Sequence, residues 1–299
     1  EIMGGFFPDE VTILAARTSV GKSALATQFS FDSIEGRPND AVLYVSLEMP
    51  ARAFTGRIMA GRAGVNSKRI RRQTCTLEDL TKLEATAVKM AGTRVYFVDS
   101  QVQTIMSIDT TAKRIGVMLA REGARLVMIV IDHLGIVKAS SRNIPREQQV
   151  AEVSRGCKFL AQQHYCHVMG LAQIARESER QTEKDKMPKL HHLRESGSLE
   201  QDPENVLILH RERDQNGRFD ATKPARLDVA KARNDATGLV WLAMLPEIGR
   251  FIPWEKSEHA KARAPDPNRN PSRPYVAPPS EPPGRFPDDA PVNAFEDMR

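Results

Sequence analysis

The chain has 299 residues, of which 40% are hydrophobic, and its formal net charge is +5. This length allows one large α/β domain or two small ones, and no apolar run approaches the roughly 20 residues that a membrane span needs. Three cysteines lack paired zinc spacing, and their odd number argues against a disulfide framework, so we expect a cytoplasmic protein without a membrane partner. The chain does not begin with methionine and shows no secretory leader, so we expect a piece of a longer protein.

Strand-like and helix-like segments alternate along most of the chain. Strands are predicted at 11–15, 42–46, 95–98, 126–131 and 168–171, and helices at 22–33, 51–61, 77–90, 108–122 and 147–163. Alternating units with apolar strands predict a mainly parallel sheet flanked by helices. Short strands then follow at 206–210, 226–230, 239–245 and 251–253. The sequence therefore predicts an α/β fold with an antiparallel C-terminal extension.

The composition changes near the C-terminal end. Residues 256–299 are rich in proline and poor in aliphatic side chains. Such a segment cannot bury enough apolar surface to offset the entropy lost on ordering. We therefore expect a folded domain at 1–255 and a disordered tail at 256–299.

Residues 16–23, with the sequence ARTSVGKS, lie between the first predicted strand and the first predicted helix. This context is the one that a phosphate-binding loop needs, because backbone N–H groups and the helix dipole point at one spot. Lys22 adds a positive charge, and Ser23 is placed to hold Mg²⁺. Ala16 stands where glycine is usual, so the turn must begin with a negative φ. A chance match in a Gly/Ser loop is the alternative. The expected phosphate contacts are Thr18, Ser19, Val20, Gly21, Lys22, Ser23 and Ala24.

Two acidic residues follow predicted strands. Asp132 ends an apolar strand at the edge where parallel sheets bind ligands. This position favours a role in binding the metal ion over that of an aspartate that merely ends the strand. Glu48 comes just after another buried strand, and Pro50 begins the next helix. Glu48 is either a group fixed close to the γ-phosphate or an acid that complements the helix dipole, and these alternatives stay open.

Polar residues elsewhere suit phosphate contacts. Gln173 ends a further strand at the same edge, where an amide could sense the γ-phosphate, although a surface glutamine is the common alternative. Lys231 and Arg233 lie on one face of a strand that enters a turn. Two aligned cations there suit a phosphate in this subunit or in a neighbour. The histidines lack a complete set of metal ligands, and His133 is given no role.

Several segments in chain order carry a resemblance to one family. They are Gly4-Gly5-Phe6-Phe7, ARTSVGKS at 16–23, SLEMP at 46–50, the strand ending in Asp132, Glu152-Val153-Ser154-Arg155 with Lys158, LRESGSLEQD at 193–202, and Lys231-Ala232-Arg233-Asn234. Together they resemble the C-terminal ATPase domain of the DnaB-type replicative helicases, a P-loop NTPase with a RecA-like fold. The match runs from about Gly4 to Trp254, and SLEMP and LRESGS are its most specific parts.

The resemblance implies roles at an ATP site with Mg²⁺. The residue matching Glu48 is the catalytic base that polarises the attacking water. Residues matching Lys22, Ser23 and Asp132 hold phosphates and Mg²⁺. Arg57 resembles the arginine that lies against the adenine.

The resemblance also implies an assembly of identical subunits. Gln173 would couple the γ-phosphate to the DNA-facing loops. Residues like Lys231 and Arg233 reach into the active site of the adjacent subunit, where the arginine acts as a finger on the transition state. The implied assembly is a homohexamer, with a helicase loader as a possible further partner.

The LRESGS segment resembles a channel loop that grips single-stranded DNA. Arg194 would contact a phosphate, Gly197 would let backbone N–H groups approach, and Glu195 would shape the loop. Such contacts depend on salt and are blind to sequence, which suits a 5′ to 3′ helicase moving along any strand.

Some features depart from the family. The match does not include the family's N-terminal primase-interacting domain. His133 stands where the family usually has an aromatic residue, and Asp202-Pro203-Glu204 replaces a more usual Asp-x-Asp. We expect proline to stiffen the exit of the channel loop. The alternatives to a helicase are a RecA-like ATPase that DNA stimulates without unwinding, and a non-catalytic DNA-binding scaffold.

Overall fold

The computed structural model describes residues 2–99, 103–140, 144–174, 188–193 and 197–257. Its strands are β1 Val11–Ala16, β2 Asp40–Ser46, β3 Arg94–Val98, β4 Arg125–Asp132, β5 His167–Gln173, β6 Asn205–His210, β7 Ala225–Ala232, β8 Gly238–Leu245 and β9 Arg250–Pro253. Its helices are α1 Lys22–Asp32, α2 Ala51–Ala63, α3 Ser67–Arg72, α4 Leu77–Met90, α5 Ile105–Arg121, α6 Arg146–His164 and α7 Gly197–Gln201. Of the tail predicted at 256–299, residues 258–299 lie outside the described residues.

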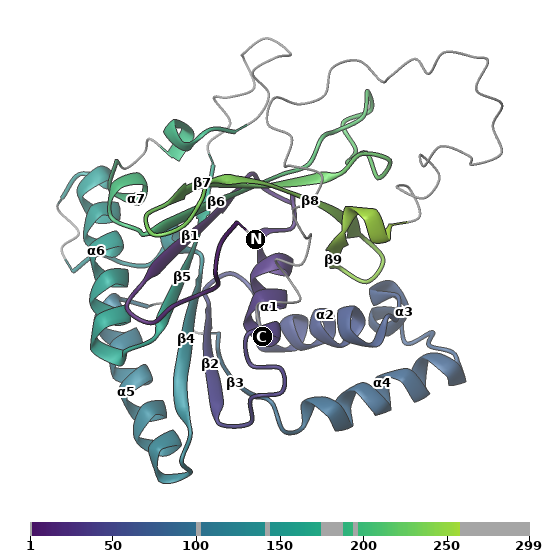
Figure 1. Cartoon of the computed structure of the whole chain (residues 1–299). Coiled ribbons are helices and arrows are strands. Elements are labelled where there is room, and N and C mark those ends of the chain that lie inside the picture. Colours follow the sequence, from purple (N-terminus) through teal and green to yellow (C-terminus); the bar gives the residue numbers. More distant parts are fainter. Residues whose placement is uncertain (1, 100–102, 141–143, 175–187, 194–196, 258–299) are drawn as a thin grey trace.

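All of these strands join one nine-stranded sheet in the order β3-β2-β4-β5-β1-β6-β7-β8-β9 (Figure 1). From β3 to β6 each neighbouring pair is parallel, and from β6 to β9 each pair is antiparallel. The predicted α/β fold with an antiparallel extension is therefore confirmed. In the described part of the chain, no helix is long and apolar enough to cross a membrane.

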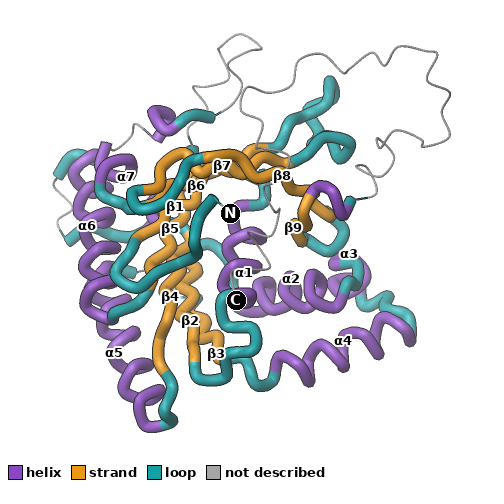
Figure 2. Tube along the Cα trace, viewed as in Figure 1, coloured by secondary structure: helices purple, strands orange, loops and turns teal. Residues whose placement is uncertain are grey.

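Helices cover both faces of the parallel part of the sheet (Figure 2). On one face α5 and α6 pack against Ile129 and Ile131 of β4, and on the other α1 and α2 pack over Met128 and Val130. Successive side chains of a strand point to opposite faces, so a strand covered on both sides must be apolar at nearly every position. That is why β4 was recognisable as a continuous apolar run.

The structure adds elements that the sequence pattern did not predict. The helices α3 and α7 have only six and five residues, too few to show a hydrophobic period. The helix α5 begins at Ile105, before the predicted residue 108. Its start is set by a capping box, in which Thr104 and Ser107 each accept a hydrogen bond from the other's backbone N–H.

The strand register defines two edges that matter for function. At the carboxyl edge the parallel strands end, and Ala16 of β1 lies beside Gln173 of β5. At the amino edge the parallel strands begin, and Asn205 of β6 pairs with both Thr12 of β1 and Ala232 of β7. Because β7 is antiparallel to β6, its end lies where the parallel strands start. Residues after β7 are therefore brought to the amino edge.

Candidate functional site

The loop between β1 and α1 has the geometry of an anion site. Ser19 and Gly21 have positive φ angles of 67° and 115°, whereas Ala16 is not among the described residues with positive φ. Helix α1 starts directly after Gly21, and among the described residues no side chain caps it and no acid lies in its first turn. Its first N–H groups and the positive end of its dipole are therefore available to an anion.

Gly21 is required by packing as well as by its φ angle. A Cβ atom at this position would lie 2.9 Å from Cζ of Phe251 in β9. The backbone N–H of Phe251 in turn donates to Oε1 of Gln28 on α1, at 3.1 Å. The antiparallel extension therefore holds the outer side of the loop in place.

Asp132 and Tyr44 are buried at the carboxyl edge, and Lys22 is half-buried beside them. The Asp132 side chain is almost fully buried, and its Oδ2 accepts a hydrogen bond from the Tyr44 hydroxyl at 3.2 Å. Burial lowers the pKa of Lys22, while the charges of Asp132 and Glu48 act in the opposite direction. Burial and the charge of Asp132 raise the pKa of Tyr44 well above its ordinary value, so the hydroxyl stays a donor.

The carboxylate of Asp132 is suited to bind a metal ion. Its Oδ1 atom is buried and accepts no hydrogen bond from the described residues. The described residues contain no group of three or more His, Cys, Asp or Glu side chains able to hold a metal ion. A site for Mg²⁺ would therefore rest on Asp132 and Ser23 together with the phosphates of a ligand, which is the usual arrangement for this cation.

A backbone contact fixes the position of Glu48. The N–H of Leu47 donates to the carbonyl oxygen of Asp132 at 2.8 Å. The Ser46 hydroxyl donates to the Met49 carbonyl at 2.8 Å and accepts from the Met49 N–H at 3.1 Å. This turn presents Glu48 as an exposed carboxylate next to the buried Asp132.

Gln173 joins the same group of residues. Its side-chain Nε2 donates to the Thr18 hydroxyl of the loop at 2.9 Å. The backbone continues this contact, because the N–H of Ile174 donates to the Ala16 carbonyl at 3.0 Å. The chain that leaves β5 is thus attached to the phosphate loop by one side-chain bond and one backbone bond.

Arg57 lies on α2 at the outer side of α1. It is exposed and lines a small hollow together with Ala24 and Thr27. Its charge also acts on Tyr44, where it tends to lower the pKa of the hydroxyl. This position is compatible with contact to the base of a nucleotide whose phosphates lie at the loop.

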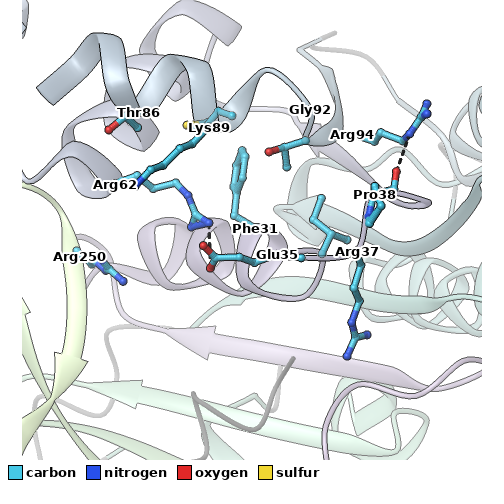
Figure 3. Close-up of a pocket in the computed structure, with 14 residues that line it drawn as sticks. Phe31, Glu35, Arg37, Pro38, Arg62, Thr86, Lys89, Gly92, Arg94 and Arg250 are labelled. Atoms are coloured by element: carbon cyan, nitrogen blue, oxygen red, sulfur yellow. Dashed lines mark hydrogen bonds and ion pairs between the residues drawn. The ribbon is translucent and has the colours of Figure 1, made fainter. Parts of the chain in front are cut away.

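A separate cavity of about 420 Å³ lies near the carboxyl ends of α1 and α4 (Figure 3). Arg62 reaches across it to Glu35, with nitrogen and oxygen 3.3 Å apart. Helix α1 has 11 residues, so its two ends are about 16 Å apart. The cavity therefore does not belong to the site around Lys22.

Lys231 and Arg233 do not join the carboxyl edge. Lys231 donates to the carbonyl oxygens of Glu200 and Gln201, at 2.9 and 2.8 Å. Arg233 donates to Oε1 of Glu204 at 3.2 Å. About 13 Å of strand separate Thr12 from Ala16, which exceeds the length of either cationic side chain. These two cations cannot reach the phosphate loop of their own chain.

Of the three predicted DNA-contacting residues, the structure describes Gly197. Arg194 and Glu195 lie outside the described residues. Gly197 is the first residue of α7, and it is exposed. Helix α7 packs on α6, where the Ser154 hydroxyl donates to the Ser198 carbonyl at 3.3 Å.

Sequence reasoning missed two residues that the structure brings into these sites. Tyr44 is an ordinary strand residue in the sequence, and only the pairing of β2 with β4 places it beside Asp132. Glu204 was noted in the sequence only because Asp202-Pro203-Glu204 departs from the family pattern. In the structure its carboxylate accepts hydrogen bonds from three separate parts of the chain. The one sequence signal for this role is an acidic residue directly before the buried strand β6.

A phosphate loop after the first strand, with a buried acid at the end of a neighbouring parallel strand, defines a RecA-like P-loop nucleotide-binding domain. The family model "DnaB-like helicase C terminal domain" matches residues 1–253. The chain therefore belongs to the DnaB-like helicase C-terminal domain family.

Similar proteins agree with this assignment. The replicative DNA helicase DnaB of Geobacillus stearothermophilus is 32% identical over 253 residues, covering 84% of this chain and 54% of the relative. DnaB of Leifsonia xyli subsp. xyli is 33% identical over 251 residues, covering 84% and 53%. A solved DnaB-like replicative helicase, described with its interactions with primase, has a TM-score of 0.75 at 27% identity over 83% of this chain and 59% of that one. The chain thus spans about half the length of the curated relatives it matches.

Proposed function

We propose that this chain is the ATP-dependent motor domain of a DNA helicase that translocates 5′ to 3′ on single-stranded DNA during replication. The observation that carries this proposal, beside the family membership, is the separation of two sets of phosphate-binding groups. One set gathers around Lys22 at the carboxyl edge, and the other, Lys231 with Arg233, lies at the amino edge. A second copy of the chain is needed to bring the two sets to one triphosphate.

In this proposal the carboxyl edge binds ATP with Mg²⁺. The N–H groups of residues 18–24 and the charged amine of Lys22 hold the phosphates. Ser23 and the buried Oδ1 of Asp132 would hold Mg²⁺, which when bound neutralises charge on the β- and γ-phosphates. Arg57 would lie against the adenine, on the outer side of α1.

Glu48 would act as the base of the hydrolysis. It is exposed and tied through Leu47 to Asp132, so it can orient a water molecule against the γ-phosphate and accept its proton. Gln173 already contacts Thr18 of the loop. It would therefore sense the γ-phosphate and pass its state to the segment after β5.

Lys231 and Arg233 would complete the site of a neighbouring subunit. A contact between two different surfaces of identical chains repeats, and it closes into a ring when the rotation allows. The resemblance implies six copies. Arginine supplied in this way stabilises the charge that develops on the transferred phosphoryl group.

The proposed DNA contacts lie at residues 194–197. Arg194 would bind a phosphate, and the exposed Gly197 would let the strand approach the backbone, while Glu195 shapes the loop. The relatives are named replicative DNA helicases, which supports action on replicating DNA, and the proposed compartment is the cytoplasm. A helicase loader would be a further partner.

A mixing experiment tests the proposal. We expect Lys22→Ala and Arg233→Ala to lower DNA-stimulated ATP hydrolysis at least about 100-fold each. In mixed rings about a quarter of the interfaces would combine an intact Lys22 site with an intact Arg233, so hydrolysis should recover in the mixture. Sizing in a non-hydrolysable ATP analogue checks that the rings form.

Three outcomes would contradict the proposal. Wild-type turnover by Arg233→Ala would remove the trans-acting role of that residue. Hydrolysis by the wild-type ring without displacement of a duplex strand would favour the DNA-stimulated ATPase that does not unwind. A well-formed ring that hydrolyses no ATP at all would favour the non-catalytic scaffold.

A further inference from the structure

The carboxylate of Glu204 lies at the centre of the amino edge and is only 5% exposed. Its Oε2 accepts from the backbone N–H of Val11 at 2.9 Å, and its Oε1 accepts from Lys158 at 2.9 Å and from Arg233 at 3.2 Å. Burial alone would raise the pKa of Glu204, but the bonds from Lys158 and Val11 outweigh it and keep the pKa below its ordinary value. Glu204 is therefore an ionised anchor for two cations.

Helix α7 provides a second anchor beside the first. The last carbonyl groups of a helix have no partners inside the helix. At the end of α7 these carbonyls belong to Glu200 and Gln201, and both accept from the Lys231 amine. Arg233 adds a long contact to the Gln201 carbonyl at 3.5 Å. The two cations thus cap α7, which begins at Gly197, the last residue of the segment proposed to bind DNA.

The backbone around the cations is fixed independently of their side chains. The N–H of Arg233 donates to the Glu204 carbonyl at 3.0 Å, and Asn234 donates to the Glu10 carboxylate at 2.8 Å. The side chain of Arg233 nevertheless remains 54% exposed. A fixed backbone with an exposed guanidinium allows the side chain to change partner without moving the strand.

The N–H that Arg233 donates to Glu204 is not available to the γ-phosphate of a neighbouring subunit, and the nearby carboxylate offsets part of the guanidinium charge. We propose that Glu204 and the carboxyl end of α7 form a docking position that holds Arg233 and Lys231 away from the neighbouring site. Glu204 is then a positioning residue that competes with the triphosphate for Arg233. Since α7 follows the DNA-binding segment, a shift of α7 on DNA binding would release the cations. This inference rests on the proposed function.

The test compares ATP hydrolysis with and without single-stranded DNA. Glu204→Gln removes the charge that holds Arg233, so turnover without DNA should rise about three- to fivefold, as expected for loss of a partly exposed ion pair. Lys158→Met removes the cation that shares Glu204 with Arg233, so Glu204 should hold Arg233 more firmly and turnover without DNA should fall. If Glu204 had a purely structural role, turnover without DNA would change in the same direction in both variants.

Two further variants make the result specific. In an Arg233→Ala background, Glu204→Gln should have no effect on the ratio of turnover with and without DNA. Glu212→Gln removes the charge of a comparable carboxylate, which pairs with Lys223 and Arg226. It should leave the ratio of turnover with and without DNA unchanged.

Several results would overturn the docking position. One is a change of DNA-independent turnover in the same direction in Glu204→Gln and Lys158→Met. Another is an effect of Glu204→Gln on the turnover ratio that persists in the Arg233→Ala background. If Glu204→Gln does not fold, unchanged or raised DNA-independent turnover in Lys158→Met contradicts the inference by itself. Failure of Arg233→Ala to lower turnover would instead overturn the proposed function, so the two failures are distinguishable.

Discussion

Each edge of the sheet has a buried carboxylate, but the cation beside it is half-buried at the carboxyl edge and exposed at the amino edge. Asp132 is buried and bonded to Tyr44, and Lys22 is half-buried beside it. Arg233 is half exposed and is held by one carboxylate. Enclosed groups cannot reorganise cheaply, so they suit the binding of a ligand in one geometry. Exposed cations suit a contact that forms and breaks with each turnover.

The largest expected effect lies at the carboxyl edge. Glu48→Gln removes the proposed base, so ATP hydrolysis should fall by about 10²- to 10⁴-fold, while nucleotide affinity stays close to wild type. Lys22→Ala should lose affinity as well, because we propose that Lys22 contacts the phosphates. Binding of a fluorescent ATP analogue and phosphate release separate the two effects. Equal loss of affinity in both variants would contradict the assignment of Glu48.

The second prediction compares two glycines with positive φ. Gly21→Ala meets both a φ of 115° and the Phe251 ring at 2.9 Å, whereas Gly249→Ala has a φ of 71° and open space around it. Gly249→Ala should cost about 1 kcal/mol of stability from backbone strain alone. Gly21→Ala should cost more and should also weaken nucleotide binding. Thermal unfolding and nucleotide titration check this, and equal losses in both variants would show that the Phe251 contact is unimportant.

A pH dependence of stability is expected from one histidine near each edge. Burial lowers the pKa of His167 at the start of β5, and of His210 at the end of β6, to about 4. The ordinary value is near 6.5, so between pH 6.5 and 4 the unfolded chain binds protons that the folded chain does not. Stability therefore falls as the pH falls through this window, by about 2 kcal/mol per histidine at pH 5.

Urea denaturation at pH 7 and pH 5 measures this loss. His167→Asn and His210→Asn should each remove about half of the acid sensitivity that the two histidines produce together. A loss of stability between these pH values that neither variant reduces would contradict burial of the neutral rings.

Much of the fold followed from the sequence because its signals are local. The apolar run before Asp132 predicted β4, and the period of 77–90 predicted α4 with the bounds found. The loop at 16–23 was recognised because a strand, a glycine-containing turn and a helix follow one another directly. The short helices α3 and α7 were not predicted, since five or six residues cannot show a period.

The sequence by itself determined the longer elements, the phosphate loop and the family, because each depends on residues that are close together or in a fixed order. Only the tertiary structure decided which groups meet. The pairing of β2 with β4 joins Tyr44 to Asp132 across 88 positions, and the contact of Glu204 with Val11 spans 193. The antiparallel turn into β7 sends Arg233 to the amino edge. Strand order and register set these contacts, and neither is written in local hydrophobic patterns.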